Sequence, residues 1–116
     1  MQLMDNTVRN IKPEEYALTM YLLTLVNDKR SEQFTPGVVK VLNDGEMGSI
    51  EFITEKDRKF GKDIVQVMYV DEDNIDVLIT LIEDNNGDLY ELEFWKTNFK
   101  KLIKYPNPEE VVLVAA

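Results

Sequence analysis

The chain of 116 residues contains no cysteine and no histidine. Without cysteine it can form no disulfide, thiolate nucleophile or thiolate metal site, which is compatible with a reducing compartment. Without histidine it lacks the commonest general base and the commonest ligand for zinc-type metals. Catalysis would need carboxylate, lysine, tyrosine or hydroxyl groups in a recognisable constellation, and the sequence shows none. We therefore expect a protein that is not an enzyme and has no cofactor.

Long apolar runs and basic residues are also scarce. No stretch reaches the length of about 18 apolar residues that a membrane span needs, and the start, Met1–Asp5, lacks the basic and apolar regions of a secretory signal. These absences predict a cytoplasmic protein with no membrane partner. The 13 bases are outnumbered by 22 acids, giving a net charge of −9. This charge argues against nucleic acid as a partner and favours fast encounter with basic proteins.

Apolar residues make up 44% of the chain, enough for one core, and residues 1–116 are interpreted as a single domain. Pro13 suits the first position of a helix, and Glu14 and Glu15 suit its positive end. From Tyr16 onward, apolar residues recur at spacings of three and four. The pattern predicts an amphipathic helix that ends at about Asp28.

The rest of the chain has short β-branched and aromatic runs separated by turn residues, which are typical of strands. Strands are predicted at residues 38–42, 49–54, 64–70, 75–82 and 89–95, with a charged loop at 55–63. The predicted fold is α+β, with an N-terminal amphipathic helix packed on a mostly antiparallel sheet of about five strands in a meander. The ordered core is expected at about 9–106, with 107–116 as an edge strand or a tail.

The acidic turns invite a calcium interpretation, since Asp84, Asn86 and Asp88 alternate as oxygen donors. An EF-type loop needs glycine at its sixth position and glutamate at its twelfth, whereas here Gly87 is fourth and Trp95 twelfth. We expect no metal site, and we interpret these residues as turn formers.

Residues 71–95 carry nine acidic residues and no base. If these acids gather on one face beside Trp95, they combine steering charge with an aromatic anchor, as protein-binding surfaces often do. The simpler alternative is a solvated sheet face with Trp95 packed inward. The predicted partner-binding residues are Asp71, Glu72, Asp73, Asp76, Asp84, Asp88, Glu91, Glu93 and Trp95.

Two strings, NDGEMGS at residues 43–49 and ELEFWKTNF at 91–99, resemble a family of small uncharacterised bacterial proteins. That family also tends to open with a helix after a Pro-Glu-Glu-like start and to close near a Tyr-Pro, as at residues 13–15 and 105–106 here. The resemblance covers roughly residues 9–106, and it implies no chemistry.

By size, acidity and lack of catalytic groups, the chain is also similar to immunity proteins of bacterial toxin systems. That analogy implies a domain that binds and neutralises a cognate basic toxin, often a nuclease. Two alternatives stay open. One is a small-ligand or metal-binding domain with a carboxylate-lined cavity, and the other is a homo-oligomeric scaffold or adaptor.

Overall fold

The computed structural model describes residues 7–116. The start at Met1–Asp5, on which the expectation of no secretory signal rests, lies outside the described residues. The elements are β1 (Val8–Asn10), α1 (Pro13–Leu25), β2 (Val38–Val41), β3 (Ile50–Phe52), β4 (Phe60–Val70), β5 (Asp76–Asp84), β6 (Leu89–Lys96) and β7 (Val112–Ala115), with 3-10 helices η1 (Lys29–Glu32) and η2 (Pro108–Glu110).

Helix α1 begins at Pro13, and its first turn is closed by Glu15, whose Oε1 accepts a hydrogen bond from the Lys12 backbone N–H at 2.9 Å. The helix ends three residues earlier than predicted. Asn27 takes a left-handed conformation with φ of 55°, and the N–H of Asp28 donates to the carbonyl of Leu23 at 2.9 Å. This geometry is a common way to end a helix, because it satisfies carbonyls of the last turn.

Within residues 7–116, the strands form one sheet of seven in the order β1-β2-β3-β6-β5-β4-β7, and every neighbouring pair is antiparallel. The α+β class is confirmed, but the count of about five strands is too low. The meander was also wrong, because β3 pairs with β6 and the chain crosses over to reach β4. The helix is not the first element, since β1 precedes it, and β4 begins at Phe60 inside the expected charged loop.

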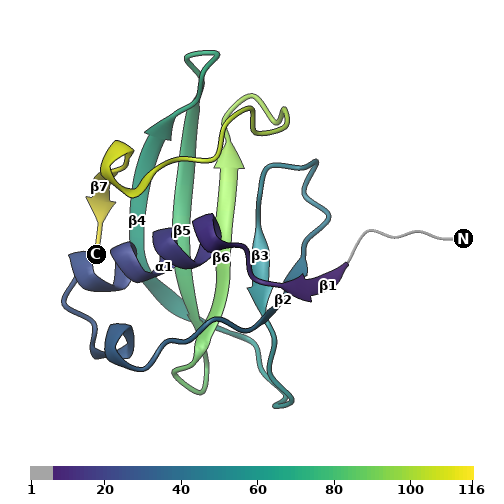
Figure 1. Ribbon diagram of the computed structural model, residues 1–116, viewed down its shortest axis with the longest axis vertical. Coiled ribbons are helices and arrows are strands. Elements are labelled where there is room, and N and C mark those ends of the chain that lie inside the picture. Colours follow the sequence, from purple (N-terminus) through teal and green to yellow (C-terminus); the bar gives the residue numbers. More distant parts are fainter. Residues whose placement is uncertain (1–6) are drawn as a thin grey trace, which may run out of the picture.

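Helix α1 lies across the central strands β4, β5 and β6 (Figure 1). Its buried residues Leu18, Leu22 and Leu23 belong to the same hydrophobic core as Val67, Ile79 and other inward residues of the sheet. Side chains alternate along β6, so Leu92, Phe94 and Lys96 point toward this core. The residues between them on the strand point to the opposite side of the sheet. Within residues 7–116, no helix is long and apolar enough to cross a membrane.

Candidate functional site

The structure divides the predicted partner-binding residues among three places. Asp71, Glu72, Asp73 and Asp76 lie at or beside the turn that joins β4 to β5, Asp84 and Asp88 lie at the turn from β5 to β6, and Glu91, Glu93 and Trp95 lie along β6. Because β5 spans residues 76–84, the two turns are at opposite ends of the sheet. The acidic stretch therefore does not form one continuous surface.

Asp71 is buried, with 2% of its surface exposed. Its Oδ2 accepts hydrogen bonds from the Lys96 ammonium and from the Ile103 N–H, both at 2.8 Å. Burial alone would raise the pKa of Asp71, but these donors outweigh it and hold the pKa below its usual value. Asp73 shares the same ammonium at 2.8 Å. This cluster ties the end of the sheet together and leaves Asp71 unavailable to a partner.

Asp84 is also buried, and it organises the turn between β5 and β6. Its Oδ1 accepts from the N–H groups of Asn86 at 2.8 Å and Asp88 at 3.0 Å, and its Oδ2 lies 3.4 Å from the Arg58 guanidinium. Asp84 thus serves the local backbone, whereas the Asp88 carboxylate pairs with the Lys56 ammonium at 3.3 Å. Among residues 7–116, no group of three or more acidic side chains is placed to hold a metal ion.

The outer side of β6 brings carboxylates together. Glu91 lies directly opposite Glu51 of β3, and Glu93 lies opposite Thr80 of β5. Partial burial and the carboxylates of Glu51 and Glu93 raise the pKa of Glu91. The pKa of Glu93 is raised by partial burial and by Asp63 and Asp44. Like charges directly opposite in an antiparallel pair destabilise a sheet. The Arg58 guanidinium, 3.1 Å from the Glu51 carboxylate, offsets this in part, and the remaining negative potential lies at Glu91 and Glu93.

Trp95 stands at the end of this surface with 44% of its area exposed. Its ring packs against Phe99 with a centroid distance of 6.1 Å, and Phe99 is 70% exposed. A hollow of about 410 Å³ lies beside Trp95, Glu91 and Glu93, and the loop after β2 forms its other wall. We call Glu51, Glu91, Glu93 and Trp95 the β6 acidic face. It contains three of the predicted residues, Glu91, Glu93 and Trp95, which line the same hollow.

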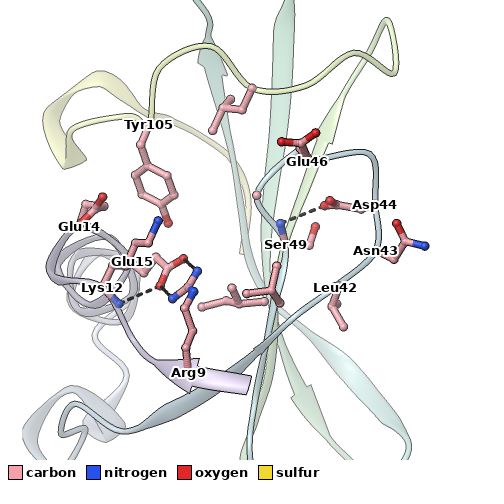
Figure 2. Close-up of a pocket in the computed structure, with 14 residues that line it drawn as sticks. Arg9, Lys12, Glu14, Glu15, Leu42, Asn43, Asp44, Glu46, Ser49 and Tyr105 are labelled. Atoms are coloured by element: carbon pink, nitrogen blue, oxygen red, sulfur yellow. Dashed lines mark hydrogen bonds and ion pairs between the residues drawn. The ribbon is translucent and has the colours of Figure 1, made fainter. Parts of the chain in front are cut away.

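A second hollow, which the sequence did not indicate, opens at the N-terminal end of α1. This cleft has a volume of about 490 Å³ and lies between α1 and the loop that joins β2 to β3 (Figure 2). On its helix side, the Arg9 guanidinium donates two hydrogen bonds of 2.8 Å to the carboxylate of Glu15, which is 3% exposed. The sequence indicates Glu15 only as an acid at the positive end of the helix.

Tyr105 supplies the other notable group of the cleft. Its hydroxyl oxygen is buried and has no hydrogen-bond partner among residues 7–116. Burial, with the nearby carboxylates of Glu15 and Glu14, raises the pKa of Tyr105, so the phenol stays protonated. The pair Tyr105-Pro106 stood out in the sequence only as part of the family resemblance. No local pattern showed that its hydroxyl would be enclosed, because the groups around it come from β1, α1 and the β2–β3 loop.

The fold and these two hollows define a small α+β domain with one helix packed on an antiparallel sheet. Residues 8–106 match the family described as Domain of unknown function (DUF6984), and the chain belongs to this family. The match contains all of the elements from β1 to β6 and ends before η2 and β7. No match was found among curated proteins or among solved structures.

Proposed function

We propose that this chain is a non-catalytic, cytoplasmic protein-binding domain that uses the β6 acidic face to bind a basic protein. The observation that carries the proposal is the direct cross-strand pairing of Glu51 with Glu91, in which Arg58 pairs with Glu51 at 3.1 Å while Glu91 forms no ion pair with any residue in 7–116. An antiparallel sheet gains nothing in stability from two carboxylates at opposed positions. Groups that weaken a fold in this way are found where binding requires them.

The surroundings of this pair support a protein partner. Trp95 and Phe99 present exposed aromatic surface beside the carboxylates, and aromatic residues are enriched among the side chains that carry binding energy at interfaces. The hollow of about 410 Å³ at Glu91, Glu93 and Trp95 has room for a protruding side chain. A lysine or arginine of the partner would meet carboxylates there and would lie near an aromatic ring.

Within this class, we propose toxin neutralisation as the particular role. A net charge of −9 on 116 residues accelerates encounter with a basic toxin domain such as a nuclease, whose active site must attract phosphate. An immunity protein would occupy that basic active site or a neighbouring surface. In this role the chain needs no catalytic group of its own.

The test begins with capture of partners from the source organism on the tagged chain, followed by identification and purification of any stoichiometric partner. The double variant Glu91→Lys and Glu93→Lys should then lose binding to that partner by at least tenfold. The matched control is Glu32→Lys with Glu109→Lys, which makes the same change in charge at two exposed positions outside the face. A partner that is not basic, or equal losses in both variants, would overturn the proposal.

A further inference from the structure

The floor of the cleft at α1 carries a charge pair that is already satisfied. Glu15 Oε1 accepts from Arg9 and from the Lys12 N–H, and Glu15 Oε2 accepts a second bond from Arg9. Since the guanidinium and the carboxylate neutralise one another, this pair offers no net charge to a ligand. The pair holds the floor of the cleft in place.

Tyr105 is different, because its hydroxyl meets no partner among the described residues. A buried hydrogen-bond donor is costly unless it finds an acceptor. Figure 2 shows the Tyr105 side chain descending from the chain after β6 toward the Arg9–Glu15 pair, with the β2–β3 loop across the cleft. Since the phenol is protonated, it needs an acceptor oxygen such as that of a carboxylate or carbonyl.

The rim of the cleft carries charge of both signs. Glu14 and Lys12 on the helix side and Glu46 on the loop line the cleft, and none of the three side chains forms an ion pair with any residue in 7–116. Two carboxylates and one ammonium group favour a ligand that itself carries both charges over free phosphate or sulfate. The walls between rim and floor include Leu42, Ile50 and Leu102, which suit a small apolar body.

We propose that this cleft binds a small zwitterion of the α-amino-acid class. Its carboxylate accepts the hydrogen bond of Tyr105, its ammonium group lies near Glu14 and Glu46, and its side chain packs on the apolar walls. The volume of about 490 Å³ falls within the range of about 300–1,000 Å³ typical of small-molecule pockets. The two hollows share lining residues of the β2–β3 loop and its surroundings, namely Leu42, Asn43, Asp44 and Ser49. The groups that would bind the amino acid are not those of the β6 acidic face, so this inference does not depend on the protein-binding function proposed above.

The experiment is isothermal titration calorimetry of the full chain with each of the twenty L-α-amino acids. We expect saturable binding of at least one of them with a Kd below about 1 mM. The N-acetyl derivative, which lacks the cation, and the methyl ester, which lacks the carboxylate, should each bind at least tenfold more weakly. Absence of saturable binding by all twenty would overturn the proposal, as would equal binding of either derivative.

Two variants locate the site. Tyr105→Phe removes a hydroxyl that makes no internal hydrogen bond, so it should keep the melting temperature of the wild type while losing at least tenfold in affinity. Tyr21→Phe is the matched control, because Tyr21 lies exposed on α1 and does not line the cleft, and it should bind as the wild type does. Wild-type affinity in Tyr105→Phe would refute the assignment. The Glu91→Lys and Glu93→Lys variant should keep amino-acid binding, so failure of one proposal is distinguishable from failure of the other.

Discussion

The Lys96 ammonium lies 2.8 Å from Oδ2 of Asp71, and both side chains are fully buried. Lys96 ends β6, Asp71 follows β4, and the same carboxylate accepts from the N–H groups of Ile103 and Lys104. The turn after β4, the end of β6 and the chain that follows β6 therefore meet at one ion pair. A buried charge is tolerated only when it is paired and hydrogen-bonded, so each member of the pair depends on the other.

Replacing Asp71 with alanine should strongly destabilise the fold. The change leaves a buried ammonium with one carboxylate in place of two, and it removes the acceptor from three backbone N–H groups, those of Glu72, Ile103 and Lys104. Loss of one partner of a buried pair typically costs about 3–5 kcal/mol. Urea denaturation measures the difference. Asp73→Ala is the control, because that carboxylate is 33% exposed and its loss should cost about 1 kcal/mol or less. Equal costs would show that the burial of Asp71 has no energetic weight.

Glu91→Gln should stabilise the fold at neutral pH. Partial burial and the carboxylates of Glu51 and Glu93 raise the pKa of Glu91, so the folded chain holds this proton more tightly than the unfolded chain does. For a carboxyl whose folded pKa is raised, the stability is greatest below the unfolded pKa and is lost as pH rises through the folded pKa. The gain from glutamine should therefore be present at pH 7, narrow as pH falls through the raised folded pKa, and be absent below about pH 4.3, the ordinary glutamate pKa.

Urea unfolding at several pH values checks the Glu91→Gln result. Glu109→Gln provides the comparison, since Glu109 is exposed in η2. A gain at pH 7 in both variants would mean that net charge, and not the crowding of carboxylates on β6, is responsible.

Gly61→Ala should disturb the pairing of β4 with β5. A Cβ at Gly61 would clash with the backbone carbonyl of Asp84, and the two strands already shift register between Phe60 and Lys62. Because the neighbour is backbone, the strands must move apart, and such overpacking typically costs about 1–3 kcal/mol. Gly37→Ala is the control, because a Cβ there meets nothing within 4 Å. Thermal unfolding of the two variants measures this difference. Equal melting temperatures would contradict the close approach of Gly61 to the backbone of Asp84.

The sequence was a good guide to local structure and a poor one to strand order. The start of α1 and the central strands follow from Pro13 and from the alternation of apolar residues, which are local signals. The crossover that places β3 beside β6 depends on which edges meet in space, and no turn residue encodes it. Strand β1 has only three residues, with Arg9 and Asn10 among them, so its pattern is too short to identify.

The candidate functional site shows the same contrast between local signals, which the sequence carries, and contacts between distant segments, which it does not. The excess of acid in residues 71–95 is visible in the sequence. Charge alone does not distinguish the buried Asp71 and Asp84 from the partly exposed Glu91 and Glu93, because all four side chains are carboxylates. Their burial depends on donors from distant segments, such as Lys96 for Asp71 and Arg58 for Asp84. The α1 cleft was missed for the same reason, since Tyr105 and Glu15 are 90 positions apart in the sequence.

Trp95→Ala should weaken partner binding far more than it weakens the fold. Trp95 is 44% exposed, so its truncation should lower the free energy of unfolding by less than a core aromatic does, for which the loss is about 3–5 kcal/mol. As an interface anchor it should raise the dissociation rate by a factor that corresponds to about 2 kcal/mol or more. Phe94→Ala is the contrasting variant, because Phe94 is 1% exposed and its loss should reduce stability by the full core amount.

The salt dependence of association tests the carboxylates next to Trp95. Electrostatic steering raises association rates by about 10- to 1,000-fold and is screened by salt. Binding of the identified partner by the wild type should therefore slow steeply between low and physiological salt. The double variant Glu91→Gln and Glu93→Gln should show a shallower dependence, while Trp95→Ala should keep the wild-type slope and change only the dissociation rate. Surface plasmon resonance at several salt concentrations separates the two effects. If Trp95→Ala binds as tightly as the wild type, the β6 acidic face is not the binding surface.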